Sequence, residues 1–141
     1  MEILDKIDIG HTQIFRRADG LVVIEGSNRV YSTFDIKEIH QAVQKINFQE
    51  KALLLIRPDQ YTSVDQGARQ FLATTEAGLQ SIAEAYIIKS LAQRILLNFL
   101  IKVNGTPVPA KFFTDETEAI AWLKTHQSNK TLHKQTAVQN A

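Results

Sequence analysis

The polar side chains best placed to do chemistry lie in one short stretch, residues 57–69, between two apolar segments. Pro58 disfavours a helix at the residue before it and cannot donate to a strand ladder, so this stretch starts as a loop after a predicted strand. In open α/β sheets, ligands bind beyond the carboxyl ends of the strands, where this loop emerges. Together with the serine after the next strand, the candidate ligand-binding or regulatory residues are Asp59, Tyr61, Ser63, Asp65, Arg69 and Ser90.

Two interpretations of these residues stay open at this point. Ser63 and Ser90 each precede a predicted helix, and two helix N-termini with hydroxyl side chains could bind a small anion. Serines in such positions also act simply as N-caps, accepting a hydrogen bond from their own helix. The sequence does not decide between an anion site and two structural caps.

No catalytic or metal centre is indicated elsewhere. The histidines lack metal-ligand spacing, and the chain has no Gly-x-Ser-x-Gly elbow, Walker-type loop or Gly-x-Gly-x-x-Gly fingerprint. The absence of cysteine excludes disulfides and thiolate nucleophiles and fits a cytoplasmic location. We therefore expect a non-enzymatic protein with no catalytic residues, no metal and no cofactor.

Composition narrows the classes of partner. The 141 residues carry a net charge of +1, which argues against binding to nucleic acid because such binding needs dense clusters of Lys and Arg. The most apolar segment, residues 95–101, contains Asn98 and is far shorter than the roughly 20 residues of a membrane-spanning helix. We expect a soluble cytoplasmic protein with no membrane span.

Periodicity predicts the elements that would position the candidate residues. Residues 2–26 resemble a β-meander with an Asp19-Gly20 hairpin turn, in which the charged segment 12–17 is the expected edge strand. Strands and helices then alternate, beginning with a helix that Ser32 and Asp35 would cap. Further strands are predicted at 51–57, 83–89 and 108–113, with helices at 63–75, 90–103 and 115–124.

This order predicts an α/β fold with a mixed β-sheet, in which an antiparallel N-terminal meander precedes a βαβαβα continuation with parallel strands. We expect one domain over residues 1–126 and a flexible polar tail over residues 127–141.

The helix predicted at 90–103 is unusually apolar. On a helical wheel, Leu91, Ile95 and Phe99 fall in its apolar half, while Leu97 and Ile101 fall in the middle of the polar half. These two side chains could be sheltered by the last helix or the tail, could form the mouth of a lipid or apolar-ligand site, or could belong to a partner or dimer surface. The residues of that predicted surface are Arg94, Leu97, Asn98, Ile101 and Lys102.

Several segments resemble a family of small bacterial proteins without an established activity, grouped with the STAS-like, SpoIIAA-like domains. The similarity lies in Ala68-Arg69-Gln70-Phe71-Leu72, Ala85-Tyr86-Ile87-Ile88-Lys89-Ser90, Asn98-Phe99, Pro109-Ala110-Lys111-Phe112-Phe113-Thr114 and Glu118-Ala119-Ile120-Ala121-Trp122-Leu123. It covers residues 50–125 well and the meander only by pattern. The resemblance implies a STAS-like mixed sheet flanked by helices and non-enzymatic binding. We expect a protein-interaction or regulatory domain whose partner is either an unknown protein or a second copy of the chain in a homodimer.

In the anti-sigma-factor antagonists of this fold, a phosphorylatable serine lies in an Asp-Ser-Ser-Gly turn at the start of the second helix. Here Asp65-Gln66-Gly67 stands at that place with no serine between, and Ser63 is the nearest substitute. An alternative function is binding of an apolar or anionic small molecule, as in the CRAL-TRIO lipid carriers of related architecture. A lined cavity would favour that ligand carrier, whereas a solid core with an exposed apolar stripe would favour the contact protein.

Overall fold

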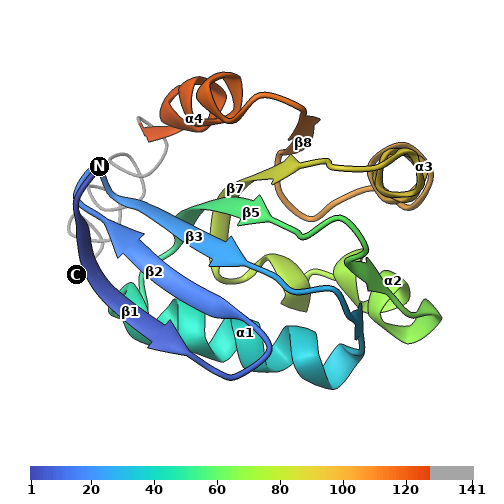
Figure 1. The fold of residues 1–141 in the computed structure, drawn as a ribbon, viewed down its shortest axis with the longest axis horizontal. Helices are drawn as coiled ribbons and strands as arrows, with labels where there is room; N and C mark the ends of the chain where they lie inside the picture. Colours follow the sequence, from blue (N-terminus) through green and yellow to red (C-terminus); the bar gives the residue numbers. More distant parts are fainter. Residues whose placement is uncertain (128–141) are drawn as a thin grey trace.

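A computed structural model of the chain describes residues 1–127, which form a sheet with helices on both faces (Figure 1). The elements, in chain order, are β1 (Ile3–Asp8), β2 (Gln13–Arg17), β3 (Leu21–Glu25), β4 (Val30–Tyr31), α1 (Thr33–Ile46), β5 (Ala52–Arg57), β6 (Ser63–Val64), α2 (Gln66–Leu72), the 3₁₀-helix η1 (Glu76–Gly78), β7 (Ser81–Ile87), α3 (Leu91–Asn98), the π-helix η2 (Phe99–Asn104), β8 (Ala110–Phe113) and α4 (Glu116–Lys124). The predicted tail, residues 127–141, lies outside the described residues except for Gln127.

The main sheet is mixed, as the sequence predicts. Its six strands lie in the order β1-β2-β3-β5-β7-β8. β1, β2 and β3 pair antiparallel, whereas β3–β5, β5–β7 and β7–β8 pair parallel. Gly20, at φ 89°, closes the turn between β2 and β3, because positive φ there suits glycine. The antiparallel meander and the parallel βαβαβα continuation are both confirmed.

The predicted edge strand is wrong. β2 lies between β1 and β3, so β1 forms this edge of the sheet. Arg17 is not an edge charge but a buried one, whose Nη2 lies 2.8 Å from Asp19 Oδ2 across the hairpin turn. The charge of residues 12–17 suggested exposure because the sequence does not show that Asp19 neutralises Arg17.

Two short strands form a second sheet that the sequence does not predict. β4 and β6 pair parallel, with Val30 opposite Ser63 and Tyr31 opposite Val64. Strands of two residues are too short to show periodicity. The pairing fixes the loop after β5 against the segment that leads into α1.

Each face of the main sheet has its own core, and Figure 1 shows α1 and α4 on opposite sides of the sheet. Alternate residues of the central strands point to each side, so Leu54 packs on the α1 side and Leu55 on the α4 side. On the α4 side, Ala119 and Leu123 are fully buried. Among residues 1–127, every helix falls short of the length and apolarity that a membrane crossing requires.

The N-terminus of α1 confirms its predicted N-cap, whereas that of α2 does not. Ser32 and Asp35 form the predicted capping box of α1. Ser63, in contrast, does not open the second helix, because it lies in β6 and the helix begins only at Gln66. Asp65 is the N-cap of α2, and its side chain accepts a hydrogen bond from the Ala68 amide.

Candidate functional site

The residues of the predicted contact surface lie on α3 and η2, but Leu97, at the centre of that surface, lies on the buried side of the helix. Leu97 is only 8% exposed, and Ile101 is half-buried. Leu97 is sheltered because it packs with Ile88 and Leu100, although the helical wheel places it in the polar half. The exposed side chains are instead Leu91 (71%), Ile95 (62%), Phe99 (45%) and Val103 (68%), a set that we call the exposed stripe.

Gln93 explains the orientation of α3. Its side chain is 5% exposed, although a helical wheel counts a glutamine as an outward residue. Nε2 of Gln93 donates to the backbone carbonyl oxygens of Asp59 at 2.7 Å and Thr62 at 3.1 Å. Its Oε1 accepts from the Lys89 amide at 2.8 Å. Gln93 thus joins α3 to the loop after β5, which directs Leu97 inward and the stripe outward.

The polar residues of the predicted surface differ in their exposure to solvent. Arg94 and Lys102 are exposed, and the Arg94 guanidinium lies over the Phe112 ring at 6.0 Å. Asn98 is half-buried, and its buried Oδ1 has no hydrogen-bond partner among residues 1–127. Arg94 and Lys102 remain available to a partner beside the exposed stripe, whereas Leu97 does not.

The residues of the predicted loop site make separate contacts. Asp65 and Ser90 cap their own helices, with Ser90 Oγ accepting from the Gln93 amide at 3.2 Å. Tyr61 is exposed and Asp59 contributes its backbone carbonyl to Gln93. Ser63 lies half-buried in β6, and Arg69, also half-buried, has a buried Nε without a partner within the described chain. For Ser90, the structural-cap interpretation agrees with the geometry.

A cavity of about 130 Å³ lies on the α1 side of the sheet, partly open to solvent. β3, β5 and β7 provide its floor, and α1, α2 and α3 cover it. Its lining is mostly apolar and includes Ile24, Ile36, Ile39, Leu54, Ile56, Leu72, Leu96, Leu97 and Leu100. Gln93, Thr62 and Ser63 line it too, so the loop singled out by the sequence forms part of one wall.

The floor of the cavity contains one carboxyl group, that of Glu84 in β7. In the sheet register Glu84 lies beside Leu54, and Tyr86 lies beside Ile56. The Tyr86 hydroxyl donates to Oε1 of Glu84 at 2.8 Å, and the Ser81 hydroxyl donates to Oε2 at 2.7 Å. Burial raises the pKa of Glu84, against the opposing effect of these hydrogen bonds. Burial and the neighbouring Glu84 charge raise the pKa of Tyr86 well above its usual value.

The sequence holds a signal for Glu84 that periodicity alone overlooks. Ser81–Ile87 reads SIAEAYI, so a carboxylate interrupts a central strand with helices on both sides. Such strands are normally apolar throughout. An ionisable residue within one points to a functional site more directly than the polar loop does.

His40 also lines the cavity, from α1. Its ring packs against Phe71 with 5.9 Å between the ring centroids. Burial lowers the pKa of His40 to about 4, because the charged imidazolium is poorly solvated there. His40 is therefore neutral near pH 7.

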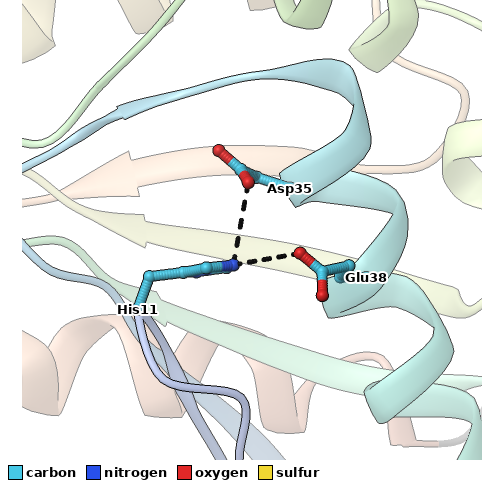
Figure 2. A group of neighbouring side chains, drawn as sticks. All are labelled: His11, Asp35 and Glu38. Carbon is cyan, nitrogen blue, oxygen red and sulfur yellow. Dashed lines mark hydrogen bonds and ion pairs between the residues drawn. The ribbon is translucent and has the colours of Figure 1, made fainter.

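A second polar group lies at the N-terminal turns of α1, where Figure 2 shows His11 directed toward Asp35 and Glu38. Nε2 of His11 is 3.3 Å from Glu38 Oε1 and 3.8 Å from Asp35 Oδ1. On the other side of the ring, Nδ1 is 2.6 Å from Thr12 Oγ1. The sequence gives no metal-ligand spacing here, because the β1–β2 turn brings His11 to a helix far along the chain.

Asp35 is already bound on its other side. The Arg29 guanidinium donates to both carboxylate oxygens, at 3.1 and 3.2 Å, and the Ser32 amide donates to Oδ2 at 3.0 Å. Burial alone would raise the pKa of Asp35, but these hydrogen bonds and the Arg29 charge hold it below its usual value. Since Arg29 already supplies a positive charge, we interpret the His11 group as a tie between the β1–β2 turn and α1 rather than as a metal centre.

Comparison with known proteins gives a family but no activity. Residues 15–127 match a family described as a domain of unknown function (DUF7793). No curated protein and no solved structure matches the chain.

Proposed function

The chain belongs to the DUF7793 family, and we propose that it is a non-enzymatic, STAS-like protein-interaction domain whose contact surface is the exposed stripe of α3 and η2. The STAS-like assignment is supported by the mixed sheet with helices on both faces, which the sequence resemblance implies. The observation that carries the contact role is the stripe itself. It places four large apolar side chains, each 45% or more exposed, along one helical face.

An exposed apolar stripe of this kind is unusual on a domain that also buries an apolar core on each face of its sheet. Contiguous exposed apolar side chains commonly mark protein contact sites, and aromatic residues such as Phe99 are enriched at their centres. α4 does not cover the stripe, because α4 packs on the other face of the sheet. The spacing of four residues between Leu91, Ile95, Phe99 and Val103 suits an elongated partner segment lying along the helix.

Charge indicates which kind of partner fits. Residues 85–114 contain Lys89, Arg94, Lys102 and Lys111 but no Asp or Glu, and all four cations are exposed. A second copy of the chain would bring the same positive surface against this one. An amphipathic protein segment with acidic side chains beside its apolar face would instead be attracted to it. We therefore favour such an acidic partner over a homodimer.

Site-specific photo-cross-linking in the cells of origin tests this proposal. A benzophenone amino acid at Ile95 is expected to give a discrete covalent adduct with another protein. The same amino acid at Glu118, an exposed position on α4, is the matched control and is expected to give none. Adding Leu91→Ser should abolish the adduct in a protein that still folds.

Three results would contradict the proposal. The two positions could give the same adducts, or Ile95 could give none. An adduct of twice the mass of the chain would replace the acidic partner by a second copy. The salt dependence of a purified complex is a further check, because an attraction between Lys or Arg and carboxylates weakens as ionic strength rises.

A further inference from the structure

The cavity on the α1 side of the sheet points to a second binding function, separate from the exposed stripe. We propose that it binds a small apolar molecule, about the size of one aromatic ring, that carries a hydrogen-bond donor directed at Glu84. The inference does not depend on the proposed protein contact. α3 contributes Leu96 and Leu97 to the cavity and η2 contributes Leu100, and both helices present the exposed stripe on their other side.

The volume sets the size of the ligand. A cavity of about 130 Å³ is close to the roughly 150 Å³ of an engineered apolar cavity that binds benzene. It is well below the range of about 300–1,000 Å³ that is typical of pockets for drug-sized molecules. One ring with a short substituent fits this space, whereas the acyl chains of a lipid need more.

The lining sets the character of the ligand body. The side chains from β3, β5 and α1 that surround the space are Ile24, Leu54, Ile56, Ile36 and Ile39. These five side chains form no hydrogen bonds to water, so this part of the wall favours an apolar ligand body. His40 is neutral near pH 7, since burial lowers its pKa to about 4, and so adds no positive charge to the wall.

Glu84 sets the polar end of the ligand. Each carboxyl oxygen accepts one hydrogen bond from the protein, from Tyr86 or Ser81, and each can accept another. Within residues 1–127, no Lys, Arg or His forms an ion pair with Glu84. A half-buried carboxylate that faces an apolar cavity without a cation beside it is unfavourable, and a ligand amine or hydroxyl would supply a further donor.

The two hydroxyl groups also hold the carboxyl in place before a ligand arrives. Tyr86 lies two residues from Glu84 on the same face of β7, and Ser81 lies three residues before it. A preorganised acceptor at the floor of an apolar cavity distinguishes ligands by their polar group. It favours an ammonium, accepts a hydroxyl and rejects a carboxylate, which would place two negative charges side by side.

Four ring compounds of similar size separate the parts of this proposal: benzylamine, benzyl alcohol, toluene and benzoate. Each is titrated into the full-length protein and followed by the backbone amide signals of the cavity residues. We expect benzylamine to bind most tightly, benzyl alcohol and toluene more weakly, and benzoate not at all. The shifted signals should belong to β5, β7 and α3.

Two pairs of variants supply the controls. Glu84→Gln should weaken benzylamine binding by about tenfold or more and leave toluene binding within about twofold, because only the charged hydrogen bond is lost. Glu118→Gln, on the exposed face of α4, should change neither. Leu96→Phe, which fills the cavity, should weaken binding of every probe, whereas Leu91→Phe on the exposed stripe should not.

The outcomes separate cleanly. If no probe shifts the cavity signals at millimolar concentration, the binding site is disproved. If benzoate binds as tightly as benzylamine, or if Glu84→Gln leaves benzylamine binding unchanged, the role of Glu84 is disproved. Should Leu96→Phe fail to fold, the Glu84→Gln comparison still decides. None of these results bears on the cross-linking at Ile95, so the two proposals can fail independently.

Discussion

Replacing Gln93 by methionine tests the contact that orients α3. Methionine has nearly the same length but can neither donate to the Asp59 and Thr62 carbonyls nor accept from the Lys89 amide. Each of these three bonds contributes about 1 kcal/mol net, so Gln93→Met should lower the free energy of unfolding by about 2–3 kcal/mol. The loss is at the lower end of this range if the Asp59 and Thr62 carbonyls form hydrogen bonds to water instead. Because Gln93 is almost fully buried, the lost bonds cannot all be replaced in place.

Urea unfolding monitored by circular dichroism measures this loss. Gln70→Met is the matched control, because Gln70 is an exposed glutamine on the neighbouring helix α2 and should give a change below about 0.5 kcal/mol. Hydrogen exchange adds a local measurement: the Lys89 amide should lose protection in Gln93→Met and keep it in Gln70→Met. Equal stability of the two variants, with Lys89 still protected, would refute the reasoning.

Three further predictions concern separate parts of the fold. The pKa of His40 lies at about 4 in the folded state against 6.5 for the free side chain, so the unfolded state takes up the proton first and stability falls as pH drops from about 6.5 to about 4. At about 1.4 kcal/mol per pKa unit, this shift lowers the free energy of unfolding by about 3 kcal/mol. Urea unfolding at several pH values should show that His40→Gln lacks this pH-dependent loss. A variant that keeps the wild-type pH dependence would contradict the prediction. Asp35→Asn should cost about 1–3 kcal/mol in thermal unfolding, because Arg29 would lose its buried charged partner; an unchanged melting temperature would count against it. Gly78→Ala should cost about 1–3 kcal/mol, because an added Cβ would lie 2.8 Å from the Pro107 side chain; a stabilised variant in the same assay would show that Pro107 moves away.

Much of the fold can be predicted from local patterns. The continuous apolar run of β5 indicated a strand covered on both faces, and the Asp19-Gly20 turn indicated the β2–β3 hairpin. Ser32 and Asp35 indicated the start of α1. These features depend on neighbours in the chain. The position of β2 inside the sheet and the pairing of β4 with β6 depend on contacts between distant segments, and no local pattern encodes them.

The orientation of α3 could not be predicted because apolar residues surround most of the helix. With Leu96 and Leu97 on one side and Leu91 and Ile95 on the other, either face could be buried by hydrophobicity alone. The choice follows from the hydrogen bonds of Gln93 to a loop more than thirty residues away. The buried polar residue Gln93 therefore decides which face of α3 is buried, and a count of apolar positions alone predicts the opposite face.

The candidate sites were hidden for a similar reason. Glu84 stands alone in the sequence, and its importance follows from the cavity that other elements build around it. His11 gains its neighbours Asp35 and Glu38 only when the β1–β2 turn packs on α1. Of the residues named from the loop, Ser63 does line the cavity, but Asp65 and Ser90 serve their own helices.

Both proposals depend on which side of α3 meets solvent, and one labelling experiment measures this directly. The chain has no cysteine, so single-cysteine variants can be compared without background. With Ile95 exposed and Leu97 buried, maleimide should label Ile95→Cys rapidly and Leu97→Cys at least about tenfold more slowly in the folded protein, whereas both should react alike in urea. Faster labelling of Leu97→Cys than of Ile95→Cys would show that α3 is oriented as the sequence first suggested, and it would contradict the account.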